Sequence, residues 1–205
     1  MDVIAIMPCR GRAAQTVETV RRMLATAGTG ERASLWCVGS DVPAVVTGAL
    51  CLEVPGLTYW EALAYATDRA DAPLIATLAN DLLPGRDWLA RGVAAYRARF
   101  GEGDGLMGFN DGLHGPEHSP HFLISRGLLD RFGGWPTHYR HNFGDTELCQ
   151  RAQQAGCYGK APWAVLYHNH LESGAADDAV YAAGRATYAQ DAGLFEQRRR
   201  RGWTL

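Results

Sequence analysis

The first 81 residues alternate short apolar runs with longer amphipathic segments, and this pattern constrains the fold more than any other feature. Residues 13–26 and 59–69 repeat apolar side chains at helical spacing. Four apolar runs have the length of strands buried on both faces, at residues 3–7, 35–38, 50–54 and 74–78. Because such alternation forms βαβ units, the sequence predicts a single α/β domain with a mostly parallel central sheet flanked by helices.

Residues 82–205 are less regular. A loop rich in Gly, His and Pro spans residues 110–120 and separates two predicted strands. The other elements expected here are strands at 106–109, 121–125 and 165–167, and helices at 88–100, 126–132, 145–155 and 175–196. This half of the chain has room for a second substrate beside the βαβ half.

Composition excludes several classes of protein. With 47% hydrophobic and 20% charged residues among 205, the chain is a globular domain rather than a disordered segment. Five cysteines at irregular spacing, without a C-x-x-C pair, argue against a disulfide framework and a structural zinc site. Since no apolar run is long enough to span a bilayer and no signal peptide is evident, we expect a cytoplasmic protein without a membrane span.

Asn80 and Asp81 directly follow the fourth predicted strand. In open α/β sheets, ligands bind at the carboxyl ends of strands. One carboxylate together with phosphate oxygens is a usual ligand set for Mg²⁺, so Asp81 is a candidate metal ligand. The alternative is that Asp81 caps a helix or starts a turn through residues 82–85.

Asp145 and Glu147 open a predicted helix after Gly144. A carboxylate held rigidly at a helix start can act as a general base, and we assign that role to Asp145. Glu147 lies about 200° further around the helix and should not reach the same point. The alternative is structural: Asp145 caps the helix, and Glu147 complements the helix dipole.

Cationic side chains and imidazoles lie near the same predicted strand ends. Arg10 and Arg12 fall in the first strand-to-helix loop, where guanidinium groups beside a helix N-terminus suit a diphosphate. His168 and His170 project from one side of the end of the last strand, so either imidazole is a candidate metal ligand. The alternative is a pair of surface histidines.

Taken in order, the motifs of residues 3–170 resemble those of GT-A glycosyltransferases, specifically the family 2 type. The corresponding segments are the opening strand with Pro8 and its arginines, residues 60–81 leading to a D-x-D-like position, residues 122–135 ending in Gly-Gly-Trp, the helix beginning at Gly144, and the strand before His168. Two positions depart from the family pattern. Ala79 replaces the first acid of D-x-D, and Gly144 replaces the Glu that precedes the catalytic Asp.

The resemblance implies a GT-A, Rossmann-like fold, a nucleoside-diphosphate sugar and a metal-dependent, inverting transfer. It assigns the sugar nucleotide to residues 1–81 and the acceptor to residues 82–205, which include the C-terminal helix. It implies that Mn²⁺ or Mg²⁺ is held by Asp81 and His168, with His170 as the alternative, and that Asp145 is the base. Contacts to the sugar nucleotide are expected from Pro8, Arg10, Arg12, Asp41, Trp60, Asn80 and Asp81.

Three questions stay open at this point. The acceptor hydroxyl can belong to a saccharide, a protein or a hydroxylated base in phage-type DNA. In the DNA case, the run Arg198–Arg201 would contact phosphates, although such a run is more often a solvated helix end. A GT-A module that binds a sugar nucleotide without turnover is the alternative from another functional class.

Overall fold

The computed structural model describes residues 2–28, 32–170, 174 and 176–203. Its eight-stranded sheet has the order β3-β2-β1-β4-β7-β6-β8-β5. The strands are β1 (Asp2–Cys9), β2 (Arg32–Gly39), β3 (Ala49–Glu53), β4 (Leu74–Thr77), β5 (Leu82–Pro84), β6 (Leu106–Asn110), β7 (Phe122–Ser125) and β8 (Tyr158–His168). The helices are α1 (Ala13–Thr26), α2 (Tyr59–Thr67), α3 (Trp88–Phe100), α4 (Arg126–Arg131), α5 (Gly144–Gln154) and α6 (Ala179–Arg200).

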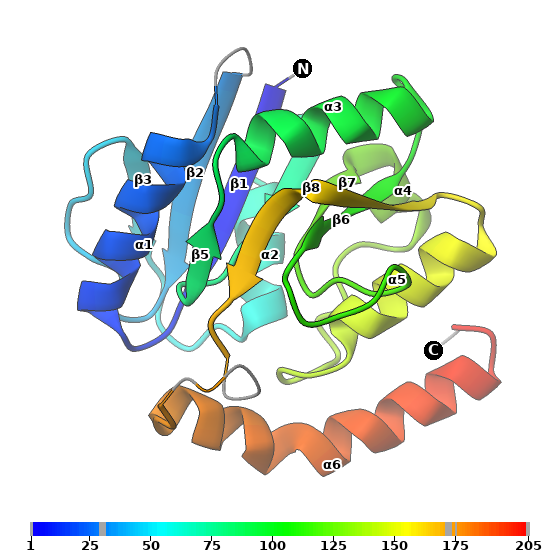
Figure 1. The fold of residues 1–205 in the computed structure, drawn as a ribbon. Coiled ribbons are helices and arrows are strands. Elements are labelled where there is room, and N and C mark those ends of the chain that lie inside the picture. The colour runs from blue at the N-terminus through cyan, green and yellow to red at the C-terminus, as the bar shows by residue number, and fades with distance from the viewer. Residues whose placement is uncertain (1, 29–31, 171–173, 175, 204–205) are drawn as a thin grey trace.

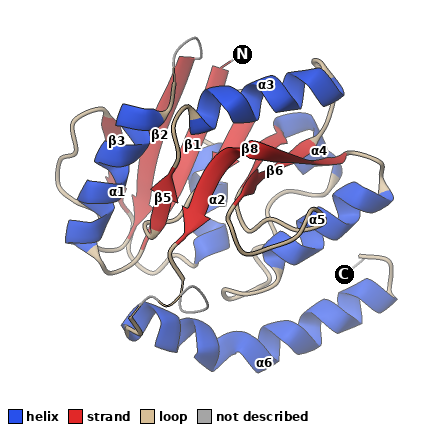
Figure 2. Ribbon diagram, viewed as in Figure 1, coloured by secondary structure: helices blue, strands red, loops and turns tan. Residues whose placement is uncertain are grey.

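The sheet changes character between the two halves of the chain (Figures 1 and 2). Strands β3, β2, β1 and β4 are all parallel, as the βαβ pattern predicts. Beyond β4 the sheet is mixed, because β7 is antiparallel to both β4 and β6, and β5 is antiparallel to β8. The pair β6–β8 is parallel again, so parallel pairs are the majority and the predicted α/β class is confirmed.

Alternation along β1 explains how the sheet divides two layers of helices. Val3, Ala5 and Met7 face a core shared with α1 and α3. Ile4 and Ile6 face a second core shared with α2, α4 and α5. Because both faces of β1 are buried, the strand is a continuous apolar run.

Helix α6 packs against the second core through Phe195 and runs beneath the carboxyl ends of β1 and β2 (Figure 1). Its N-cap is Asp178, whose side chain accepts hydrogen bonds from the backbone N–H groups of Val180 and Tyr181. The prediction placed this helix at 175–196, and the cap explains why it begins later. No helix in the described part of the chain is long and apolar enough to cross a membrane.

The sequence analysis was wrong about two strands. Residues 82–84, where no strand was expected and a turn was the alternative considered, form β5 against β8. The last strand was predicted only at 165–167 but runs from Tyr158 to His168. Its irregular pairing near Phe109 and Asn110 breaks the alternation of buried and exposed residues on which a strand prediction depends. Both errors concern pairing with distant residues, which periodicity does not report.

Candidate active site

A pocket of about 370 Å³ lies at the carboxyl ends of β1, β2 and β4, with residues of α6 forming part of its wall. Nine of the residues singled out from the sequence line it: Pro8, Arg10, Arg12, Trp60, Asn80, Asp81, Asp145, His168 and His170. Asp41 does not. Its carboxylate accepts a hydrogen bond from the backbone N–H of Gly11 at 3.1 Å, which fixes the loop that carries Arg10 and Arg12.

Asp81 is buried and has three side-chain partners. Its Oδ2 accepts hydrogen bonds from Arg12 Nη1 and from the hydroxyl of Tyr181, both at 2.9 Å. Its Oδ1 lies 3.3 Å from His168 Nε2. Burial opposes the charge, but His168, Tyr181 and Arg12 outweigh it and hold the pKa of Asp81 well below its usual range. Asp81 is therefore a charged carboxylate at neutral pH.

The pair Asp81–His168 fits one edge of a metal coordination sphere. Asp81 Oδ1 is buried and makes no hydrogen bond to any described residue. Two ligands at right angles around an octahedral ion with bonds of about 2.1 Å lie about 3.0 Å apart, close to the observed separation. Within the described ranges, no three His, Cys, Asp or Glu residues gather closely enough to hold a metal ion alone. Phosphate oxygens and water would have to complete the sphere.

Asp145 is the second residue of α5 rather than its cap, so the capping alternative is wrong. The N-cap is Phe143, in the left-handed region at φ 68°, and it makes no side-chain cap. Asp145 Oδ1 instead accepts a hydrogen bond from the N–H of Thr146 at 2.8 Å, and Oδ2 lies 3.4 Å from His118 Nε2. Burial opposes ionisation, but the contacts with His118 and Thr146 lower the pKa of Asp145.

The departure at Gly144 has a steric cause. A Cβ added at this position would lie 2.3 Å from the ring of Trp60, which itself lines the pocket. Trp60 is held there because its Nε1 donates to the carbonyl of His141 and its ring stacks on Trp135. A glutamate cannot stand at 144 while Trp60 keeps this position.

Glu147 faces away from the pocket, as its position on the helix predicts. Arg198 of α6 donates to both of its carboxylate oxygens at 2.8 Å, and Arg151 and Tyr139 donate as well. Burial opposes the charge, but the contact with Arg198 is the largest of those that lower the pKa of Glu147 well below its ordinary value. Glu147 therefore joins α5 to α6 and takes no part in the pocket.

The contact between Arg198 and Glu147 also bears on whether the run Arg198–Arg201 can bind phosphates. Arg198 is only 5% exposed, so it cannot bind phosphates while it pairs with Glu147. Arg199 pairs with Glu196 on the surface of the helix. The run is therefore not a continuous basic patch.

Histidines concentrate in the pocket, and sequence reasoning missed most of them. Six of the seven histidines of the chain line it. Three come from the loop and strand start at 110–121, which the sequence analysis described only as rich in Gly, His and Pro. Their signal in the sequence is the local density of histidine, and nothing in the spacing tells which rings face a ligand. These three are His114, His118 and His121.

His121 is 3% exposed, and neither of its ring nitrogens has a hydrogen-bond partner among the described residues. Burial and the neighbouring His168 lower its pKa to about 3, against the opposing pull of Asp81 and Asp145. The ring is therefore neutral at pH 7. Because an unpaired buried polar group costs about 1–3 kcal/mol, such a ring is more readily explained by a ligand than by packing.

Residues of α6 also shape the pocket, although the sequence gave no reason to place this helix there. Tyr181 bonds to Asp81, and its ring lies under the guanidinium of Arg12 at 4.3 Å. Asp191 is buried and accepts hydrogen bonds at 2.9 Å from three consecutive backbone N–H groups, those of residues 140–142. This carboxylate fixes the loop in which Arg140, His141 and Asn142 line the pocket.

Asn80 was expected to contact the sugar nucleotide, but its amide has a structural partner. Its side-chain Nδ2 donates to Thr16 Oγ1 at 3.1 Å, and the backbone carbonyl of Asn80 accepts from Thr19 Oγ1 at 2.8 Å. These bonds fasten the end of β4 to α1 and thereby position Asp81.

No protein-family model matches the sequence, and no curated protein matches it either. Solved structures do match. The mannosyltransferase PcManGT from Pyrobaculum calidifontis, in complex with GDP-Man and Mn²⁺, has a TM-score of 0.71 at 19% identity over 97% of this chain and 64% of that chain. The catalytic domain of Drosophila β1,4-galactosyltransferase 7, in complex with xylobiose, has a TM-score of 0.63 at 16% identity over 87% and 74%.

A third match is residues 1–349 of S. aureus TarS, with a TM-score of 0.63 at 12% identity over 82% of this chain and 60% of that chain. The chain thus spans less than two thirds of the length of the PcManGT and TarS structures. These likenesses establish the fold: the chain has a GT-A-type glycosyltransferase fold, as the sequence resemblance predicted.

Proposed function

We propose that the chain is a metal-dependent glycosyltransferase that moves a sugar from a nucleoside diphosphate to a hydroxyl group, with inversion at the anomeric carbon. The observation that carries the proposal is the presence of a candidate metal pair, Asp81 and His168, and a candidate base, Asp145, in one pocket of a GT-A-type fold. Two solved neighbours hold Mn²⁺ with GDP-Man, or manganese with UDP-Gal, which supports the same class of substrate.

In this proposal residues 1–81 bind the nucleoside diphosphate. Asp81 and His168 hold Mn²⁺ or Mg²⁺, which when bound stabilises the charge that develops on the leaving diphosphate. Arg10 and Arg12 donate charge-assisted hydrogen bonds to phosphate oxygens. Arg12 can keep its contact with Asp81 Oδ2, because Oδ1, which lies beside His168, is the oxygen that would bind the ion.

Residues 82–205 bind the acceptor and carry the base. Asp145 faces the pocket from the start of α5, where the acceptor oxygen attacks the anomeric carbon from the side opposite to the diphosphate. Buried His121 offers the transferred sugar one donor and one acceptor nitrogen, which satisfies a ring that is otherwise unpaired. A saccharide is the acceptor we favour, since xylobiose occupies one solved neighbour and Arg198, the first residue of the basic run, is buried.

Thermal-shift screening of UDP-, GDP-, CMP- and dTDP-sugars, with and without Mn²⁺, tests the first half of the proposal. The matching sugar nucleotide at 100 times its Kd should stabilise the protein by about 2.7 kcal/mol. Release of free nucleoside diphosphate on addition of saccharide acceptors tests the second half. Binding without release in any acceptor mixture would indicate the non-catalytic sugar-nucleotide module. Binding of none of the four, or of the CMP-sugar alone, which carries a single phosphate, would contradict the proposal.

A further inference from the structure

One position on the inward face of α6 is exposed although its neighbours on that face are buried. Residues three or four positions apart lie on the same side of a helix. The buried residues of α6 follow this spacing and are Tyr181, Gly184, Asp191, Phe195 and Arg198. Tyr188 completes the series, four positions after Gly184 and three before Asp191, yet its side chain is 55% exposed. Its ring therefore lies on the face that packs against the protein but is left largely uncovered there.

Tyr188 lines the same pocket as Asp145, the proposed base. Its ring packs on the ring of Phe143 with 5.1 Å between centroids. Phe143 is the N-cap of α5 and precedes Asp145 by two residues. Phe143 also stacks on the buried ring of Phe195, with 5.2 Å between centroids. The exposed ring of Tyr188 is therefore held beside the start of α5 by aromatic packing that continues into the core.

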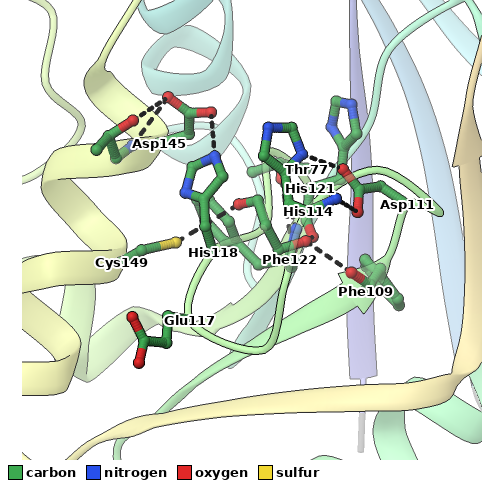
Figure 3. A network of polar contacts seen from close by, with 12 residues as sticks. Thr77, Phe109, Asp111, His114, Glu117, His118, His121, Phe122, Asp145 and Cys149 are labelled. Atoms are coloured by element: carbon green, nitrogen blue, oxygen red, sulfur yellow. Dashed lines mark hydrogen bonds and ion pairs between the residues drawn. The ribbon is translucent and has the colours of Figure 1, made fainter. Parts of the chain in front are cut away.

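The position of Asp145 determines where the acceptor must lie. Its carboxylate accepts a hydrogen bond from the N–H of Thr146 and lies 3.4 Å from His118 Nε2 (Figure 3). A general base must come within hydrogen-bond reach of the hydroxyl that it deprotonates. The part of the acceptor that carries this hydroxyl then lies against the residues around the start of α5. Among the described aromatic residues that line the pocket, Tyr188 is the exposed one.

A sugar ring matches this surface. A pyranose has a face of C–H groups and an edge of hydroxyl groups, and the negative face of an aromatic ring attracts such C–H groups. Arg140, Asn142 and Thr146 line the pocket as well and offer polar partners to the hydroxyls. A nucleobase would also stack on a tyrosine, but the nucleoside diphosphate is assigned to residues 1–81, whereas Tyr188 packs on the N-cap of α5. The position of the ring therefore favours the acceptor.

We propose that Tyr188 is the residue on which a sugar ring of a saccharide acceptor stacks, so that α6 helps to select the acceptor. The inference rests on the proposed glycosyl transfer. The stacked ring presents a hydroxyl to Asp145, and the sugar nucleotide keeps its site in residues 1–81. Because the stacking contact is made equally before and during the transfer, it contributes to acceptor binding rather than to the rate of the chemical step.

Two substitutions separate stacking from packing. Y188F keeps the aromatic face, whereas Y188L keeps an apolar side chain on Phe143 but has no flat face. We expect Y188L to raise the KM for a saccharide acceptor by about tenfold, with kcat and sugar-nucleotide affinity little changed, and Y188F to behave as wild type. The matched control is W163L, because Trp163 is 75% exposed and does not line the pocket. An unchanged acceptor KM in Y188L, or a loss of sugar-nucleotide affinity in its place, would overturn the proposal and leave the proposed transfer intact.

A measurement that needs no turnover completes the test. In ¹³C NMR of protein labelled on its tyrosine rings, the signals absent from Y188F belong to Tyr188. Cellobiose or maltose, added with UDP or GDP and Mn²⁺, should shift these signals. No shift with either disaccharide, or a larger shift with a nucleotide than with either disaccharide, would overturn the proposal. If no acceptor releases nucleoside diphosphate but a disaccharide still shifts the Tyr188 signals, the proposed transfer fails and the saccharide site at Tyr188 stands.

Discussion

The two halves of the molecule build their side of the pocket in different ways. In residues 1–81, most lining residues lie at or just beyond the ends of parallel strands, as Pro8 does at the end of β1 and Asp81 does beyond β4, and Trp60 and its neighbours come from the start of α2. In residues 82–205, they come from a loop, a helix start and a helix that crosses beneath the sheet. His118, Asp145 and Tyr181 lie on three such segments.

This difference shows which interactions hold the pocket residues in position in each half. Strand ends in the parallel part of the sheet are positioned mainly by backbone pairing and apolar packing, to which the neutral hydrogen bonds of Asn80 with Thr16 and Thr19 are added at the end of β4. The other half is positioned by buried ionic contacts, chiefly Glu147 with Arg198 and Asp191 with the N–H groups of residues 140–142. Substitutions in the second half, except at His168 and Tyr181, which contact Asp81, should therefore affect turnover or folding while sugar-nucleotide binding persists.

The largest effect is expected at Asp145. Asp145→Asn should lower turnover by roughly 10²–10⁴-fold, because the uncharged amide cannot accept the proton of the acceptor hydroxyl. The affinity for the sugar nucleotide and the midpoint of thermal unfolding should change little. Steady-state kinetics and calorimetry check both statements. Asp130→Asn, at an exposed position of α4, is the matched control and should behave as wild type. A large loss of sugar-nucleotide affinity with turnover preserved would show that Asp145 acts in binding rather than in catalysis.

Glu147→Gln should act on folding rather than on chemistry. The substitution leaves Arg198 buried without its charged partner, and breaking a buried pair in this way costs about 3–5 kcal/mol of unfolding free energy. Denaturant titration at pH 7 measures this loss. The protein that remains folded should turn over at the wild-type rate per active site, since Glu147 does not line the pocket. A stable but inactive variant would show that Glu147 is the catalytic carboxylate.

The unfolding free energy lost in Glu147→Gln should also depend on pH. Because the pKa of Glu147 is lowered in the folded protein, its contribution is fully present above the pKa of the unfolded chain, about 4.3, and is lost as pH falls below it. The difference in unfolding free energy between wild type and variant should therefore shrink between pH 5 and pH 3. A constant difference over this range would contradict a charged Glu147 in the folded state.

Asp191→Asn should lower the unfolding free energy by less than Glu147→Gln does, by about 1–3 kcal/mol. The reason is that an amide replaces a carboxylate that accepts hydrogen bonds from three N–H groups. Turnover should fall more than sugar-nucleotide affinity, since the loop at 140–142 belongs to the acceptor half. Asp177→Asn is the control, because Asp177 makes an exposed ion pair with Arg185, and such pairs contribute little. Equal losses of unfolding free energy in both variants would contradict the claim that the buried carboxylate stabilises the fold more than the exposed one does.

The contrast between the halves also explains what the sequence predicted. The helices at 13–26 and 88–100 were predicted at their observed bounds because each has one apolar face. Asp81 and Asp145 were found because strand ends and helix starts are visible in the sequence. The bonds from Asp81 to Tyr181 and from Glu147 to Arg198 join residues that are far apart in the chain, and no periodicity reports them.

The roles of individual histidines were the least accessible from sequence. His168 was preferred to His170 because the family resemblance places the ligand histidine directly after an apolar strand, and the structure places it beside Asp81. His118 and His121 lie in or next to a loop without regular spacing, so only the contact of the His118 ring with Asp145 and the burial of His121 show how the rings are placed.

The central claim is that Asp81 and His168 hold a divalent cation together with a nucleoside diphosphate. Titration calorimetry of UDP and GDP, with Mn²⁺ and with EDTA, tests it most directly in the wild type and in Asp81→Ala. We expect one of the two nucleotides to bind the wild type about tenfold or more tightly with Mn²⁺, a gain of about 1.4 kcal/mol, and Asp81→Ala to lose that gain. Equal affinity of the wild type for the bound nucleotide in Mn²⁺ and in EDTA would contradict the claim.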